Sequence, residues 1–200
     1  MSVAIGVLVV ILLGVLIRAR WGPLMEVDFT VSDELVVPGQ DSEVYLLRAL
    51  SAVGRFEVRL LVLGPLAAWL AWQHRWRLVA LVVIGGALVG PFNEVLKVIV
   101  ERPRPSYSRT IEVHGYSYPS GHAAVSAALA TILVLVFWPL LSRAWRGVLF
   151  ALAAVAVVAV GYSRVALGVH YTSDVVAGWC VGVGWVLVVA VLLRVWPDQP

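Results

Sequence analysis

His170, Asp174 and His122 have the residue types and spacing for nucleophilic catalysis. His170 and Asp174 are four residues apart, so their side chains share a helical face or meet around a tight turn. A carboxylate on one imidazole nitrogen fixes the tautomer and leaves the other nitrogen free to attack. His122 can then protonate the leaving oxygen. We therefore predict that His170 is a nucleophile, that Asp174 orients it and that His122 is a general acid.

Three cations accompany these residues and predict an anionic ligand. Lys97, Arg104 and Arg164 each have at most one carboxylate nearby in the sequence. Cations that lack an anionic partner in a partly desolvated site imply that a ligand supplies the negative charge. Arginine forks match phosphate oxygens, so the expected ligand is a phosphate. Lys97 is the only lysine in the chain, which suggests that a compact ammonium is needed there.

The run Pro119-Ser120-Gly121-His122 opens a long apolar segment and completes this predicted phosphate site. The first N–H groups and the dipole of a helix favour an anion, and Gly121 allows a ligand to approach the backbone. The predicted phosphate-binding residues are Lys97, Arg104, Ser120, Gly121 and Arg164. Their charges would neutralise the phosphoryl oxygens in the transition state. We expect no metal and no other cofactor, because no carboxylate cluster or Cys/His spacing suggests a metal site.

Each residue also has an ordinary structural interpretation. Ser120 and Asp174 are favourable N-cap residues. Arg102 and Arg104 could be arginines of the membrane interface, and Lys97 could extend to the surface. A histidine near an interface is often only a hydrogen-bonded structural residue. The convergence of so many ionisable groups at one membrane face favours a functional site.

The composition indicates the kind of element that positions these residues. Of the 200 residues, 61% are hydrophobic and 14% are charged. Soluble domains contain roughly half apolar and about a quarter charged residues, so a polytopic membrane protein is predicted. No basic run suggests nucleic-acid binding, and Cys180 has no intrachain disulfide partner. We expect one all-α membrane domain over residues 1–200, embedded in the lipid bilayer.

Six apolar segments approach the length of about 20 residues that a spanning helix needs. The predicted spans are about 2–17, 55–72, 78–100, 121–141, 147–165 and 174–193. The first is expected to be an anchor, because no small-residue cleavage site follows it. A further helix on the surface is expected near 41–53. Tryptophans lie near the ends of the spans, as an interfacial belt would place them (Trp21, Trp69, Trp72, Trp76, Trp138, Trp145 and Trp196).

The charges of the short loops predict the orientation. Loops 73–77 and 142–146 each carry two arginines, which the positive-inside tendency places in the cytoplasm. With six spans, both termini are then also cytoplasmic. All the candidate site residues lie at the opposite ends of the spans. We therefore expect a multi-pass protein of the plasma membrane with its active site on the outer face.

Three ordered motifs resemble those of a known family. The motifs are Lys97-x6-Arg104-Pro105, then Pro119-Ser120-Gly121-His122, then Ser163-Arg164-x5-His170-x3-Asp174. They match, in order and at every motif position, the signature of the type 2 phosphatidic acid phosphatase and vanadium haloperoxidase superfamily. The six apolar segments resemble its membrane branch, because the soluble haloperoxidase branch is larger and less apolar.

The resemblance implies a lipid phosphatase that works through a phosphohistidine on His170. It implies that His122 first protonates the leaving group and then activates water. Family substrates are phosphatidic acid, lysophosphatidic acid, phosphatidylglycerol phosphate and undecaprenyl diphosphate, and the sequence does not choose between them. A phosphotransferase with an alcohol acceptor remains an alternative. A non-enzymatic protein that binds or transports lipid phosphates is a more remote one.

Overall fold

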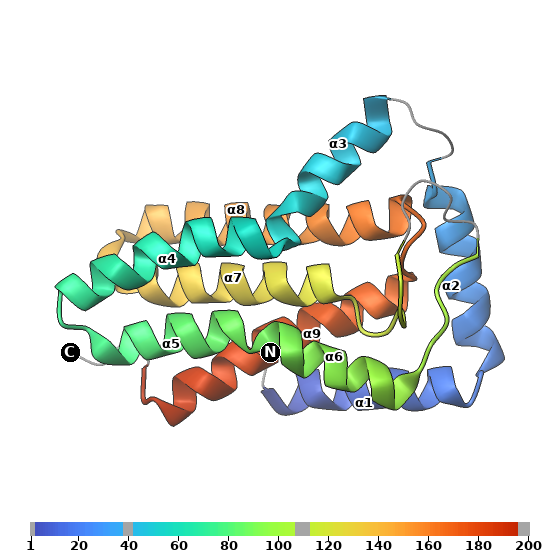
Figure 1. The fold of residues 1–200 in the computed structure, drawn as a ribbon, viewed down its shortest axis with the longest axis horizontal. Helices are drawn as coiled ribbons and strands as arrows, with labels where there is room; N and C mark the ends of the chain where they lie inside the picture. The colour runs from blue at the N-terminus through green and yellow to red at the C-terminus, as the bar shows by residue number, and fades with distance from the viewer. Residues whose placement is uncertain (1–2, 38–41, 107–112, 196–200) are drawn as a thin grey trace.

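The computed structural model describes residues 3–37, 42–106 and 113–195, and these residues form a helical bundle without strands. The helices are α1 (Val3–Arg18), α2 (Gly22–Leu35), α3 (Ser42–Ser51), α4 (Phe56–Trp72), α5 (Trp76–Ala87), α6 (Val89–Val100), α7 (Gly121–Phe137), α8 (Arg143–Ala166) and α9 (Thr172–Leu192). Two short 3₁₀ turns, η1 (Ala52–Gly54) and η2 (Trp138–Leu140), follow α3 and α7. The predicted all-α class is confirmed (Figure 1).

All six predicted spans coincide with helices, but the helices differ in length. Four are long and apolar enough to cross a membrane: Trp76–Val100, Gly121–Leu140, Arg143–Ala166 and Thr172–Leu192. The first of these consists of α5 and α6, with a break at Leu88. α1 and α4 have only 16 and 17 residues. The count of six spans therefore stays a prediction.

Helix α7 lies inside the bundle and packs closely against α9 (Figure 1). Gly178 and Gly182 of α9 make this approach possible. A Cβ atom on Gly178 would lie 2.5 Å from the carbonyl oxygen of Ser120, and one on Gly182 would overlap the carbonyl of Ala124. Because glycine leaves the two backbones in contact, the starts of α7 and α9 are brought together, and with them the second and third motifs.

The largest cluster of buried apolar side chains in the described bundle comes from five helices, α4, α5, α6, α7 and α9. Leu70 of α4, Leu81 of α5, Ile132 of α7 and Val186 of α9 are fully buried in one core cluster. The outward side of α8 carries exposed apolar residues such as Leu152 and Val155. A helix with apolar residues both inside and outside the bundle fits a lipid surrounding rather than water.

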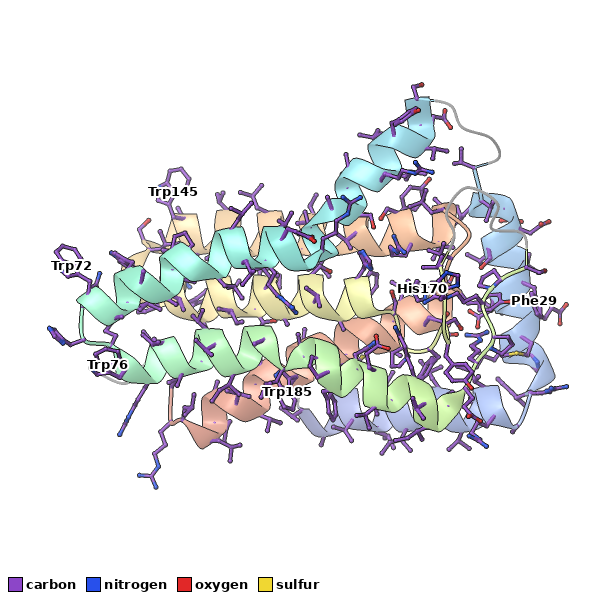
Figure 2. All side chains as sticks on the ribbon, viewed as in Figure 1. Phe29, Trp72, Trp76, Trp145, His170 and Trp185 are labelled. Atoms are coloured by element: carbon purple, nitrogen blue, oxygen red, sulfur yellow. The ribbon has the colours of Figure 1, made fainter. Side chains whose placement is uncertain are left out.

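The bundle has two different ends. Trp72, Trp76 and Trp145 are exposed at the end opposite His170, where an interfacial belt was expected (Figure 2). The predicted Trp196 lies outside the described residues. The connections from α4 to α5 and from α7 to α8 lie at this same end (Figure 1). Of the four arginines predicted to be cytoplasmic, Arg75 lies in the first connection, and the other three lie in the first turns of α5 and α8.

At the other end, α2 lies across the bundle and α3 projects away from it (Figure 1). α1 and α2 meet at an angle of 96°. The helix expected near 41–53 is confirmed as α3, whereas α2 was not predicted. These two helices and the loop after α6 surround the candidate site.

Candidate active site

His170 lies in the short connection between α8 and α9 and is almost completely buried (Figure 2). Its Nδ1 is 3.5 Å from Oδ2 of Asp174, and its Nε2 is 3.3 Å from Nη1 of Arg104. Burial lowers the pKa of His170 to about 4, so the ring is neutral at neutral pH. A ring that carries its proton on Nδ1, towards Asp174, leaves the lone pair of Nε2 towards Arg104. This is the tautomer that the predicted nucleophile requires.

Asp174 is held in place by two strong hydrogen bonds. Oδ1 accepts from Nη1 of Arg102 at 2.7 Å, and Oδ2 accepts from the backbone N–H of Tyr171 at 3.0 Å. Asp174 is the third residue of α9 and caps the helix by accepting the N–H of Tyr171, but its bond to Arg102 has no part in capping. The distance of 3.5 Å to His170 is longer than a good hydrogen bond. Such contacts often shorten when a substrate binds.

The interpretation of Arg102 as an ordinary interfacial arginine was wrong. Its side chain is 4% exposed and lies between two carboxylates. Besides Asp174, Nη2 donates to Oδ2 of Asp28 at 2.7 Å, and Nη1 donates to Oγ of Ser173 at 2.8 Å. Asp28 also accepts the backbone N–H of Ser173, and the guanidinium stacks on the ring of Tyr171. Asp28 of α2 therefore indirectly fixes Asp174.

The two arginines of the predicted phosphate site, Arg104 and Arg164, have surroundings of a different kind. Arg104 donates to the carbonyl oxygens of Gly115 and Val169, at 3.0 and 2.9 Å. Arg164 is 5% exposed and donates to Oγ of Ser51 at 2.6 Å, while its Nε has no partner. Within the described part of the chain, no carboxylate lies within 4.0 Å of either guanidinium. Their charges are available for an anionic ligand.

Lys97 differs from these arginines because it has a carboxylate partner one turn away. Its Nζ lies 2.6 Å from Glu94, whose side chain is 66% exposed. Because Glu94 is exposed to solvent, it contributes little stability by this ion pair, and a ligand can replace it. Nζ also lies 4.0 Å from the position that a Cβ atom on Gly121 would take. The ammonium is therefore next to the first turn of α7.

Ser120 and Gly121 begin α7 as predicted, but Ser120 is not a side-chain cap. Its Oγ is buried and has no hydrogen-bond partner among the described residues. Its backbone N–H donates to the carbonyl oxygen of Asp174 at 2.9 Å, which joins two of the motifs. Asn93 of α6, which the sequence analysis missed, donates to the carbonyl oxygen of Pro119 while its own Oδ1 is unpartnered. Unpartnered buried polar atoms at one place indicate a polar ligand.

His122 lies on the first turn of α7, against the η1 turn. A Cβ atom on Gly54 would be only 2.7 Å from Cδ2 of His122, so this glycine allows the contact. The positive charges of Arg164, Arg55 and Lys97 act on His122. The structure thus gathers every predicted site residue around the start of α7. No carboxylate, cysteine and histidine group of the described residues is arranged to hold a metal.

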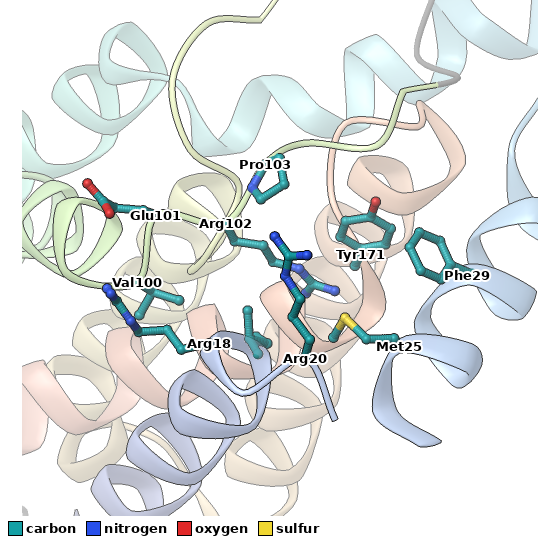
Figure 3. A pocket seen from close by; sticks show the side chains of 10 residues that line it. Arg18, Arg20, Met25, Phe29, Val100, Glu101, Arg102, Pro103 and Tyr171 are labelled. Atoms are coloured by element: carbon teal, nitrogen blue, oxygen red, sulfur yellow. The ribbon is translucent and has the colours of Figure 1, made fainter. Parts of the chain in front are cut away.

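A pocket of about 460 Å³ borders Arg102, and Asp174 is not among the residues that line it. Arg18 and Arg20 line its polar part, and Met25 and Phe29 line its apolar part (Figure 3). Arg102 forms part of the wall, so the buried network of the site closes the pocket on that side.

Comparison with known proteins finds one matching family model and several similar proteins. The family model described as PAP2 superfamily matches residues 74–197, which include all three motifs. A phosphatidylglycerophosphatase B of Bacillus subtilis (strain 168) is 36% identical over 93 residues, which are 45% of this chain and 45% of that protein. An undecaprenyl-diphosphatase of Sulfolobus acidocaldarius is 36% identical over 108 residues, 54% of this chain and 44% of that protein. The chain thus spans less than half the length of these curated relatives.

Two solved structures share the fold. The crystal structure of the first transmembrane PAP2 type phosphatidylglycerolphosphate phosphatase from Bacillus subtilis has a TM-score of 0.79 and 24% identity, and covers 92% of this chain and 93% of its own. The crystal structure of Aquifex aeolicus LpxE has a TM-score of 0.63 and 21% identity, and covers 81% of this chain and 93% of its own. At these identities the likeness concerns the fold.

Proposed function

The chain belongs to the PAP2 superfamily, and from this premise we propose that it is a membrane lipid phosphatase that hydrolyses a lipid phosphate or diphosphate. The single observation that carries the proposal is the position of His170 between Asp174 on one ring nitrogen and Arg104 on the other. A bound phosphate that accepts the N–H of Arg104 on its own oxygens would leave the lone pair of Nε2 facing phosphorus. The two curated relatives act, by name, on a glycerophospholipid phosphate and on an isoprenyl diphosphate, which supports lipid substrates.

The proposed reaction has two steps. Nε2 of His170 attacks phosphorus, the bond to the leaving oxygen breaks, and His122 donates the proton that this oxygen needs. The first step yields a phosphohistidine. In the second, His122 accepts a proton from water, the hydroxide attacks phosphorus, and inorganic phosphate leaves His170. Lys97, Arg104, Arg164, the Ser120 hydroxyl and the N–H of Gly121 stabilise the phosphoryl oxygens in both steps.

The test is phosphate release by the purified protein in detergent with EDTA. Phosphatidic acid, lysophosphatidic acid, phosphatidylglycerol phosphate and undecaprenyl diphosphate are supplied in parallel. We expect release from at least one of them and its loss in His170→Ala. The matched control is His74→Asn, at the opposite end of the bundle, where φ is 58° and asparagine is well tolerated. Full activity of His170→Ala would exclude the nucleophile.

Product analysis separates water from an alcohol as the acceptor. A lipid phosphotransferase would use the same phosphohistidine, because only the second nucleophile differs. Adding glycerol or another competing alcohol would then yield a new phosphate ester instead of inorganic phosphate. We expect inorganic phosphate to remain the main product. A dominant ester product would favour the transferase.

We further propose six spans in the plasma membrane, with both termini in the cytoplasm and the site on the outer face. The arginines of the short loops at the end opposite the site support this orientation. The only native cysteine, Cys180, is buried, so single cysteines can report accessibility. A membrane-impermeant maleimide should label Ser106→Cys in intact cells, and Ser142→Cys only after permeabilisation. The reverse pattern would invert the topology.

A further inference from the structure

The corner between α3 and α4 forms a wall of the site that lies outside the matched segment 74–197. At one end of the corner, Oγ of Ser51 accepts a hydrogen bond from Arg164 at 2.6 Å. At the other end, the backbone of Gly54 packs directly against the ring of His122. The corner thus contacts a phosphate-binding residue and the general acid of the proposed reaction.

The residue after Gly54 is an arginine whose charge is not used by the fold. Arg55 is exposed and is the N-cap residue of α4, with an extended backbone. No carboxylate of the described chain lies within 4.0 Å of it. Its charge nevertheless acts on both His122 and Arg164. An exposed cation beside the general acid is therefore free to bind an anion of the substrate.

The chemistry of the reaction says which part of the substrate this anion belongs to. A general acid protonates the oxygen that leaves, and the leaving oxygen lies roughly in line with and opposite to the nucleophile. His122 therefore marks the leaving-group side of phosphorus, and His170 the other side. Lys97, Arg104 and Arg164 neutralise the phosphoryl group that is transferred. Arg55, beside His122, is placed to meet the leaving group instead.

Lipid phosphates differ in the charge of their leaving groups. Phosphatidic acid releases a diacylglycerol, which has no charge. An isoprenyl diphosphate releases a lipid monophosphate, and phosphatidylglycerol phosphate releases a phosphatidylglycerol with its phosphodiester anion. Only the last two offer a second phosphate on the side of the general acid.

We propose that Arg55 binds a second phosphate group on the leaving-group side and makes the protein prefer lipids that carry one. Arg55 is then a specificity-determining residue, and phosphatidic acid is a poorer substrate than a lipid diphosphate or a phosphodiester-bearing lipid phosphate. This inference rests on the proposed phosphatase function, because it assigns a role to the leaving group of that reaction.

The test compares Arg55→Gln with the unchanged protein on three lipids: undecaprenyl diphosphate, phosphatidylglycerol phosphate and phosphatidic acid. For one or both of the first two, kcat/KM should fall roughly 10- to 100-fold, as loss of a charge-assisted hydrogen bond implies. For phosphatidic acid it should change less than about threefold, because the lost hydrogen bond has no counterpart there. If kcat/KM falls with only one of these two lipids, Arg55 binds the second phosphate group of that lipid. Arg55→Lys should recover part of the loss.

The matched control is Arg143→Gln, an exposed arginine at the start of α8, at the opposite end of that helix from Arg164. It should leave kcat/KM unchanged for all three lipids. Inhibition gives a second measurement, because inorganic pyrophosphate can fill both phosphate positions and inorganic phosphate only one. Arg55→Gln should weaken inhibition by pyrophosphate and not by phosphate.

Two results would overturn the inference. An equal loss on all three lipids would place Arg55 at the transferred phosphoryl group, and no loss on any would leave it without a role in substrate binding. If the unchanged protein releases phosphate from none of the lipids, the proposed function itself fails, and this inference fails with it.

Discussion

The two ring nitrogens of His170 have surroundings of opposite kinds. On the Nδ1 side, Asp174, Arg102, Asp28 and Ser173 form a buried network in which each charge has a partner at about the ideal distance. On the Nε2 side, Arg104 and Arg164 have no carboxylate partner in the described chain, and the hydroxyl of Ser120 has no hydrogen bond.

This difference separates the structural part of the site from the part that can bind a ligand. A buried charge is tolerated when it is paired, so the charges on the Nδ1 side are balanced without substrate, although Nδ1 of His170 itself makes no hydrogen bond in the described structure. The Nε2 side holds cations and polar atoms that a phosphate would satisfy. Substitutions on the Nδ1 side should therefore lower both stability and activity. Substitutions on the Nε2 side should lower activity alone.

The largest effect is expected on the paired side, from Arg102→Leu. This change leaves the carboxylates of Asp28 and Asp174 buried without compensation, which costs about 3–5 kcal/mol. We expect a much lower thermal unfolding temperature in detergent and no phosphate release. Arg20→Leu, an exposed arginine at the same end of the bundle, is the control and should unfold like the unchanged protein.

A milder change on the same side sharpens this prediction. Asp28→Asn keeps the ion pair between Arg102 and Asp174 and removes only the second carboxylate. Its loss of stability should be smaller than that of Arg102→Leu, and kcat should fall while KM changes little, since Asp28 does not face the substrate. Normal stability of Arg102→Leu would show that the network is not a structural element.

On the Nε2 side, Arg164→Gln should lower activity strongly and stability little. The change removes a buried cation without a carboxylate partner, so the free energy of unfolding should stay within about 1 kcal/mol. Phosphate release should fall roughly 100- to 1000-fold in kcat/KM, as for the loss of one transition-state charge contact. A loss of stability as large as that of Arg102→Leu would contradict the comparison.

A smaller loss is expected for Ser120→Ala. Because Oγ of Ser120 makes no hydrogen bond in the described chain, its removal should leave the unfolding temperature unchanged. A hydroxyl that donates to a charged phosphoryl oxygen is worth about 1.5–3 kcal/mol, so kcat/KM should fall by at least about tenfold. Unchanged activity would place the hydroxyl outside the phosphate site.

The smallest effect is the acid limit of the pH profile. Burial lowers the pKa of His170 to about 4, and the reaction needs its neutral form. Between the ordinary histidine value of about 6.5 and this value, the nucleophile stays neutral. The limb of kcat/KM that His170 controls should therefore fall only as the pH drops through about 4. A fall centred near pH 6.5 would show an ordinary, solvated histidine.

The same lowered pKa has a consequence for stability. Below about pH 6.5 the unfolded chain binds a proton at His170 that the folded chain does not, so unfolding becomes more favourable as the pH falls. The contribution of neutral His170 to the free energy of unfolding is fully present above about pH 6.5. It is lost progressively as the pH falls to about 4. Unfolding temperatures measured along this range would report it.

Much of the site could be predicted because its members form short, ordered motifs. The spacing of His170 and Asp174 and the run at 119–122 carry their own chemistry, and the apolar segments around them have spanning length. The helix boundaries agree with the prediction because hydrophobic runs of this length are a local property of the chain. The break at Leu88 was not predicted, although Gly90-Pro91 signals it, because Pro91 has no N–H to donate to the carbonyl oxygen of Ala87.

What the sequence could not show are contacts between distant segments. Asp28 and Ser173 are 145 residues apart, and Arg164 and Ser51 are 113 apart. Nothing near Arg102 in the chain shows that it will be buried between two carboxylates. The spacing within the motifs also does not predict that the backbone of Gly54 packs against the ring of His122.

The sequence by itself determined the membrane setting and the helical class and predicted the reacting groups, since these depend on composition and on local spacing. Only the tertiary structure decided which cations would be neutralised by the protein and which would stay available to a ligand. The physical reason is that the pairing of a charge depends on what packs against it. In this bundle the packing is set by the close approach of α7 to α9 and by two short helices, α2 and α3, at one end.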